Sequence, residues 1–211
     1  MFWQPCPIFD GDVFIIGGGP SLEGFDWSLI KGRQVIGCND AYTLGDWVTV
    51  CHFGDWNWYR LVHKKNLDRW GNLKITSFWA HKDIRLEDGS LVQPAREAKG
   101  ILVMQRDSLS GFCVDGKLAW NGNTGISSIN LAAYLGASRI ILLGFDMKRS
   151  KGKHNWHPNP RNPADIFHSF LKRAENCKRD MEKHRPDIQV LNCTPNSALT
   201  LWPIVPLEEV L

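Results

Sequence analysis

The chain has 211 residues, of which 43% are hydrophobic and 22% charged, and its net charge is +3. This length suits one well-buried domain, and the composition is that of an ordinary globular protein. The small positive charge neither demands nucleic-acid binding nor excludes it, and no apolar run is long enough to span a bilayer, so we expect no membrane partner. The six scattered cysteines contain no C-x-x-C pair, which predicts buried free thiols and a cytoplasmic location.

A glycine-rich turn follows the first predicted strand. Residues 13–16 form an unbroken apolar run, which is typical of a parallel strand buried on both faces. The run leads directly into Gly17, Gly18, Gly19, Pro20 and Ser21. Glycines let the backbone approach a ligand closely, and Ser21 can cap a short helix whose N–H groups bind phosphate. The turn is therefore predicted to bind a nucleotide. The alternative is a purely structural turn, since neither the dinucleotide fingerprint nor the P-loop pattern is complete.

Hydrophobic periodicity predicts the remaining elements. Further apolar runs indicate strands at 33–39, 47–53, 73–78, 100–104, 139–143 and 188–191, and helical spacing indicates helices at 56–70, 126–135 and 167–185. This alternation predicts a single α/β domain over residues 1–211, three-layered, with a mostly parallel Rossmann-like sheet. Residues 81–118 fit the alternation poorly. We expect them to form an insertion or lid over the strand ends, with hairpin turns at Asp88-Gly89 and Asp115-Gly116.

Polar residues stand where several predicted strands end. The candidates at these ends are Asn39, Asp55 and Asp146. They are candidates because ligands of open parallel sheets bind beyond the carboxyl ends of the strands. Asp55 has an equally good alternative role as the cap of the helix that follows it. A second helix start comes at Asn123, Thr124 and Gly125, which we expect to face an anion, with an ordinary helix cap as the alternative.

Residues 147–163 form a basic, irregular stretch that we interpret as an active-site loop. Its first half contains Lys148, Arg149, Lys151 and Lys153, followed by His154 and His157. A histidine titrates near neutral pH and suits general-base work, while cations neutralise a leaving phosphate. The alternatives are a solvated histidine pair and a metal site completed by Asp146 or Asp55. The interpretation that we favour contains no metal.

The order of these motifs resembles that of a known family. Residues 15–22, Cys38-Asn39, residues 124–126 and residues 132–146 together resemble bacterial sialyltransferases. The same skeleton is similar to the MptE-like group (domain of unknown function 115), which includes an archaeal 6-hydroxymethylpterin diphosphokinase. The tail, residues 192–199 and 206–209, looks like uncharacterised bacteriophage proteins, which would place the chain in the cytoplasm of an infected host.

The sialyltransferase resemblance implies a Rossmann-like glycosyltransferase with a nucleotide-sugar donor, of the CMP type. By this resemblance the glycine turn would hold the nucleotide phosphates, and Asn39 would bind the donor. The helix start at 123–125 would contact base or phosphate. Lys148 departs from the family, which has tyrosines after the aspartate to stabilise the leaving phosphate; the chemistry of that phosphate assigns Lys148 to a cationic clamp. The candidate catalytic residues are His154, His157 and Asp146, with one of the histidines as the general base. The acceptor, the donor sugar and the oligomeric state are left open.

Two other functional classes fit the same residues. A pyrophosphokinase of the pterin type would need ATP, magnesium and carboxylates at strand ends, and Asp40, Asp55 and Asp146 are available. A non-catalytic module would use some of the ten tryptophans as stacking platforms for nucleobases or glycans, with Trp56, Trp58, Trp79, Trp120 and Trp156 near strand ends or loops.

Overall fold

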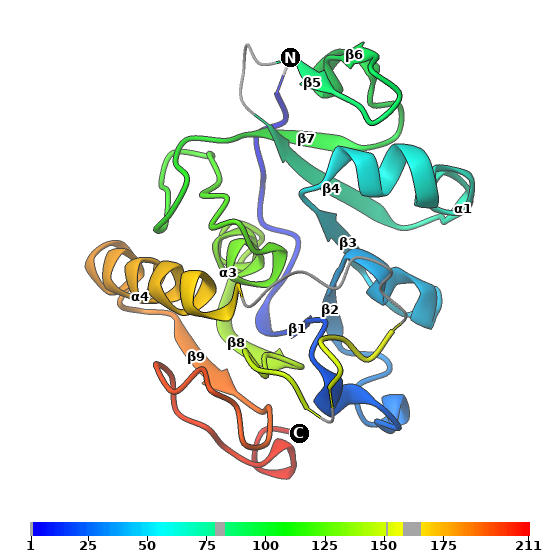
Figure 1. Cartoon of the computed structure of the whole chain (residues 1–211). Helices are drawn as coiled ribbons and strands as arrows, with labels where there is room; N and C mark the ends of the chain where they lie inside the picture. Colours follow the sequence, from blue (N-terminus) through cyan, green and yellow to red (C-terminus); the bar gives the residue numbers. More distant parts are fainter. Residues whose placement is uncertain (1, 79–82, 151, 158–165) are drawn as a thin grey trace.

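The computed structural model describes residues 2–78, 83–150, 152–157 and 166–211 (Figure 1). Its centre is a seven-stranded sheet in the order β7-β4-β3-β2-β1-β8-β9. The strands are β1 (Gly11–Ile16), β2 (Gln34–Cys38), β3 (Val50–Phe53), β4 (Leu73–Phe78), β7 (Leu102–Gln105), β8 (Ala137–Leu143) and β9 (Gln189–Asn192). Every neighbouring pair is parallel. The predicted strands and the Rossmann-like α/β class are confirmed.

Strand β1 explains why the sequence shows an apolar run instead of alternation. Val13 and Ile15 pack into one hydrophobic core, whereas Phe14 and Ile16 pack into a second core on the opposite face of the sheet. All four side chains are fully buried. A strand with covered faces on both sides has no polar positions. The molecule is therefore three-layered, as predicted.

Helices cover the two faces unequally. The first core includes side chains of α3 (Thr124–Tyr134) and α4 (Phe167–His184), which lie together on one face of the sheet (Figure 1). The second core includes side chains of α1 (Lys64–Arg69) and of the π-helical segment Trp58–His63 that precedes it. The helix predicted at 56–70 is thus found, but its first half has π-helical geometry.

The stretch 81–118, outside residues 81–82, divides into three parts. Strands β5 (Ile84–Arg85) and β6 (Leu91–Val92) form the hairpin expected around Asp88-Gly89. A short helix α2 (Pro94–Glu97) follows, and β7 then completes the main sheet as an edge strand beside β4. At Asp115-Gly116 both residues have positive φ, but within residues 83–150 the hairpin expected there is replaced by a single parallel bridge between Arg106 and Leu118.

The strand order creates a crevice at the carboxyl end of β1. From β1 the chain moves outward through β2, β3, β4 and β7, and then returns through α3 to β8 on the other side of β1. The segments leaving β1 and β8 therefore diverge. Ligands of open α/β sheets bind in such crevices, where the strand order reverses.

Two sequence expectations concern the environment of the chain. Among the described residues, no helix has the length and apolar character needed to cross a membrane. All six cysteines are free thiols, and five of them are buried, as expected, whereas Cys6 is exposed.

Candidate active site

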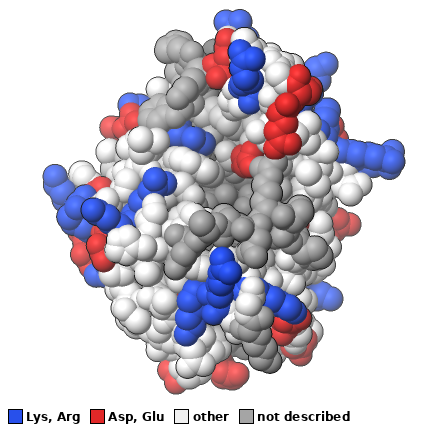
Figure 2. All heavy atoms as spheres, viewed as in Figure 1, with Lys and Arg blue, Asp and Glu red and all other residues white. Residues whose placement is uncertain are grey.

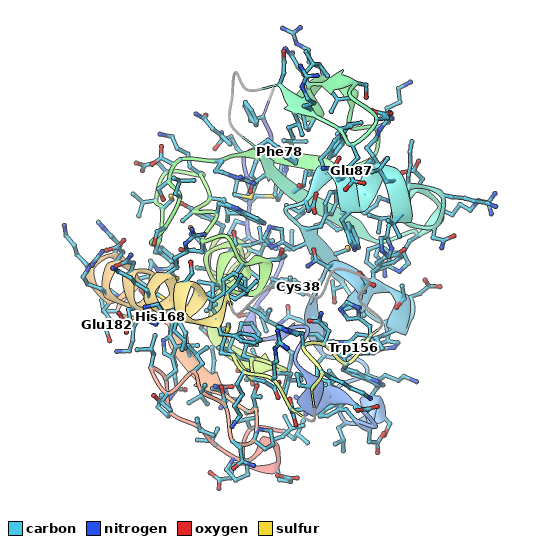
Figure 3. The ribbon with its side chains drawn as sticks, viewed as in Figure 1. Cys38, Phe78, Glu87, Trp156, His168 and Glu182 are labelled. Carbon is cyan, nitrogen blue, oxygen red and sulfur yellow. The ribbon has the colours of Figure 1, made fainter. Side chains whose placement is uncertain are left out.

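A cavity of about 520 Å³ lies at the carboxyl ends of β1, β2, β3 and β8. Its walls include these residues singled out from the sequence: Gly17, Gly18, Gly19, Asn39, Asp55, Asn123, Thr124, Gly125, Asp146, Lys148, His154 and His157. Pro20 and Ser21 follow the glycines in a 3-10 helix, Pro20–Leu22. Figure 3 labels Cys38, which also lines the cavity and marks its position near the middle of the molecule. The fold thus brings the sequence-predicted residues together.

The glycines of the turn are required by close packing against the end of β8. The Gly17 N–H donates to the Leu143 carbonyl at 2.8 Å, and the Gly19 N–H donates to the Gly144 carbonyl at 2.8 Å. A Cβ at Gly17 would lie 2.7 Å from the Gly144 carbonyl oxygen, and one at Gly19 would lie 1.8 Å from Asp146 Oδ2. Close packing therefore explains the glycines at these two positions, whether or not a ligand binds.

The helix start at Ser21 is occupied by a carboxylate of the same chain. The Ser21 N–H donates to Asp146 Oδ1 at 3.1 Å, and its hydroxyl donates to Asp146 Oδ2 at 2.7 Å. Asp146 is only 4% exposed. Burial raises the pKa of this carboxyl, and the bonds from Ser21 offset only part of that rise. The donors that sequence reasoning offered to a phosphate are used here by Asp146, which holds the turn in place.

Residues 152–157 of the basic loop are bound to the glycine turn. The Trp156 N–H donates to the Gly18 carbonyl at 3.0 Å, and its indole N–H donates to the Gly17 carbonyl at 3.1 Å. Figure 3 shows Trp156 on this yellow segment, beside the blue ribbon of the first strands. A Cβ at Gly18 would lie 2.8 Å from Asn155 Oδ1. Lys151 and residues 158–163 of the predicted loop lie outside the described residues.

Docking of this loop places His157 beside Asp40. His157 Nδ1 lies 3.2 Å from Asp40 Oδ2. On its other side the imidazole faces the turn, because a Cβ at Gly18 would lie 3.8 Å from Nε2. Burial alone would raise the pKa of Asp40, but interactions with His157, Trp58 and His63 outweigh it, so the pKa is lowered. Asp40 is therefore an ionised partner for the histidine.

A second histidine reaches the same carboxylate. His63 Nε2 lies 3.5 Å from Asp40 Oδ1, and the Trp58 indole N–H donates to that oxygen at 2.6 Å. The His63 ring stacks on Trp58 with centroids 4.1 Å apart, and its Nδ1 lies 2.9 Å from the hydroxyl of Tyr42. Burial lowers the pKa of His63, and of its two charged neighbours Asp40 raises it while His157 lowers it further.

His154 has a different environment. Its ring stacks on Phe167 of α4, with centroids 5.2 Å apart and an interplanar angle of 18°. Both residues line the cavity. The two histidines that the sequence left equivalent are thus distinguished by their surroundings: an aromatic ring holds His154, and a carboxylate holds His157.

The start of α3 presents backbone donors to the cavity. Asn123 caps the helix, its Oδ1 accepting from the Ile126 N–H at 3.0 Å. Within the described chain no group accepts from the N–H groups of Thr124 and Gly125, and both residues line the cavity. Asn39, with a φ of 51°, lies beside this helix start, and its Oδ1 accepts from the Thr124 hydroxyl at 3.4 Å. This helix start remains able to bind an anion.

Two other residues are accounted for within the fold. Asp55 Oδ1 accepts from the N–H groups of Asn57 at 2.9 Å and Trp58 at 3.3 Å, so it caps the helical segment while also lining the cavity. Trp56 is 2% exposed and belongs to the core, which excludes it as a stacking platform. Trp79 lies outside the described residues, and within them no cluster of three or more His, Cys, Asp or Glu side chains is arranged to hold a metal ion.

Basic residues gather on the loop that carries the histidines. Figure 2 shows Lys and Arg side chains grouped low on this face, where Figure 1 draws the yellow segment. Lys148, Arg149 and Lys153 are exposed in that segment, and Lys148 lines the cavity. Lys153 Nζ donates to Glu23 Oε1 at 2.6 Å. Lys148 therefore brings one positive charge of this basic segment to the cavity wall, where it suits an anionic ligand.

The sequence did not predict how three members of the site act together. It offers Asp40 only as a magnesium ligand and Trp58 only as a stacking platform, and it gives His63 no role. His63 and Trp58 belong to a segment that has the pattern of an ordinary amphipathic helix. The available signal was the set of polar and aromatic side chains immediately after β2 and β3, at the edge of the sheet where ligands bind.

Comparison with known proteins identifies likenesses of fold. No protein-family model and no curated protein sequence matches the chain. The MAf glycosyltransferase from Magnetospirillum magneticum AMB-1 superposes on the whole chain with a TM-score of 0.60 at 17% identity, and the chain spans 36% of that protein. The sialyltransferase CstII from Campylobacter jejuni, solved in complex with cytidine-5'-monophosphate, gives a TM-score of 0.54 at 16% identity over 97% of this chain and 86% of that one. A structure of CST-II in complex with trisaccharide acceptor and CMP gives 0.51 at 19% identity, over 92% of this chain and 85% of that one.

The chain therefore has the fold of bacterial glycosyltransferases, as its motifs predicted. The MptE-like and bacteriophage resemblances stay predictions.

Proposed function

We propose that the protein is a glycosyltransferase-like enzyme that moves a sugar from a nucleotide-activated donor, of the CMP type, to an acceptor hydroxyl. The observation that carries this proposal is the pairing of an open helix start with a histidine–carboxylate pair across one cavity. The fold likeness to the sialyltransferases supports it. The buried free thiols fit a cytoplasmic enzyme.

In this proposal the donor phosphate lies at the start of α3. When the bond between sugar and phosphate breaks, the sugar gains oxocarbenium character and negative charge builds on the phosphate. The N–H groups of Thr124 and Gly125 and the positive end of the helix dipole would stabilise that charge, with Lys148 at the mouth. Asn39, beside Thr124, would also bind the donor.

We assign the general base to His157. Its Nδ1 is held by Asp40, its Nε2 lies toward the glycine turn, and the residue lines the cavity. Nε2 would accept the proton of the acceptor hydroxyl while the acceptor oxygen bonds to the anomeric carbon and the nucleotide leaves with the electron pair of the broken bond. His154, stacked on Phe167, would shape the wall of the cavity. Asp146 would act by holding the turn.

Binding is tested by thermal shifts with CMP, CDP, UDP, GDP, ADP and ATP, each with and without magnesium. A ligand that binds only the folded state raises the Tm by mass action. We expect CMP to raise the Tm without metal. A shift seen with ATP and magnesium alone would favour the pyrophosphokinase, and no shift with any nucleotide would overturn the nucleotide site.

Turnover is tested with His157→Gln, using release of CMP from CMP-sugars as the assay. Loss of a general base typically costs about 10²–10⁴-fold in rate, so we expect kcat to fall in that range while CMP still raises the Tm. The matched control is His154→Gln, which should lose less. No release of CMP by the wild-type protein with any donor, despite CMP binding, would leave the binding module as the better description.

A further inference from the structure

We propose that Asp40 is the positioning residue for His157, and that His63 and Tyr42 form a second arm on the same carboxylate. The chain of groups runs from His157 through Asp40 and His63 to Tyr42. This inference rests on the proposed function only in giving His157 the role of base; the geometry itself is independent of the reaction.

The two oxygens of Asp40 are used differently. Oδ2 faces His157 Nδ1 at 3.2 Å, whereas Oδ1 accepts from the Trp58 indole at 2.6 Å and lies 3.5 Å from His63 Nε2. A carboxylate on one imidazole nitrogen fixes the tautomer with the proton on that nitrogen. The lone pair of His157 is then on Nε2, the nitrogen nearer to Gly18. The carboxylate thus prepares the ring to accept a proton from the cavity side.

The second arm holds Asp40 in this orientation. Tyr42 is 4% exposed, and its hydroxyl lies 2.9 Å from His63 Nδ1. If the hydroxyl donates to Nδ1, the neutral His63 ring carries its proton on Nε2 and directs it toward Asp40. The ring itself is clamped between Trp58, stacked at 4.1 Å, and Tyr42, edge-on at 5.6 Å. Aromatic contacts of this kind limit rotation of the ring.

The other titratable groups around Asp40 are neutral, so its negative charge acts on His157. Four titratable groups face Asp40: His157 from the loop, His63 from the π-helical segment, Cys51 from β3, and Tyr42 from the 3-10 segment Asn39–Leu44 that also contains Asp40. Burial raises the pKa of both Tyr42 and Cys51, so these two stay neutral. Because burial lowers the pKa of His63, that ring is neutral near pH 7 as well. The negative charge of Asp40 then stabilises one cation, the imidazolium of His157 that forms when the acceptor proton is taken.

The test is an NMR titration of the histidine rings, assigned with His157→Gln and His63→Gln. In the wild-type protein we expect neutral His157 to carry its proton on Nδ1. Asp40→Asn should lower the pKa of His157 by about one unit, because it removes the adjacent negative charge. The matched control is Asp55→Asn, a carboxylate of the same cavity that caps a helix, which should leave the His157 pKa unchanged.

Two outcomes would overturn the proposal. One is a wild-type His157 with its proton on Nε2, a result that needs no variant and is independent of whether Asp40→Asn folds. The other is an unchanged His157 pKa in Asp40→Asn. Neither measurement needs turnover, so absence of CMP release from every donor would defeat the proposed function and leave this one standing. With a working donor, Asp40→Asn should lower kcat with little change in KM and shift the acid limb of the pH profile downward.

Discussion

The two helix starts beside the cavity look alike in the sequence and differ in the structure. Both Ser21 and Thr124 follow a polar or glycine-rich turn, and both were predicted to bind phosphate. At Ser21 the donors are satisfied by Asp146. At Thr124 the cap is Asn123, residues 124 and 125 line the cavity, and no group in the described part of the chain accepts from their N–H groups. A helix start is available to a ligand only where the chain itself has not supplied the acceptor.

The largest expected effect is on stability, and it comes from a substitution at Gly19, beside the helix start that Asp146 occupies. A Cβ there would lie 1.8 Å from Asp146 Oδ2, so Gly19→Ala must displace a buried carboxylate that holds the turn. We expect a loss of about 3 kcal/mol in the free energy of unfolding, measured by urea denaturation. Gly71→Ala is the control, because nothing lies within 4 Å of its Cβ position. Equal stability of the two variants would contradict the role of Asp146 in holding the turn.

Anion binding at the start of α3 is tested with Thr124→Pro. Proline fits the first position of a helix and removes one N–H. Asn123, at φ −145° and ψ 119°, already has the extended conformation that a following proline requires. We expect CMP affinity to fall about tenfold with little change in the Tm of the free protein. Thr124→Ala, which keeps the N–H, is the control; a similar loss there would assign the binding to the hydroxyl.

The smallest expected effect is the pH dependence of the stability that Asp146 contributes. Its pKa is raised in the folded protein, so the folded state binds this proton more tightly than the unfolded state does. Stability from this group therefore increases as the pH falls through the raised pKa toward the ordinary value of 3.8. The difference in unfolding free energy between wild type and Asp146→Asn should shift in favour of the wild type on acidification. A difference that is flat with pH would show that Asp146 does not titrate in this way.

Much of the fold was predictable because it depends on local patterns. The run at residues 13–16 is apolar at every position because both faces of β1 are covered, and Gly136 follows α3, where the predicted helix also ends. The π-helical geometry of Trp58–His63 was not predictable, since its residues have the spacing of an ordinary helix. The Asp115-Gly116 turn was recognised from its residues, but its role depends on Leu118 bridging to distant Arg106.

The sequence by itself determined the sheet, its parallel strands and the edge at which the site lies, because burial on both faces and polar strand ends are written in short stretches of residues. It also named most of the residues that line the cavity. Only the tertiary structure decided how they pair. Asp146 holds Ser21 across 125 residues, and Asp40 takes His157 from a loop placed by Trp156. Such pairs follow from how distant segments pack, and the function proposed for each residue depends on its partner.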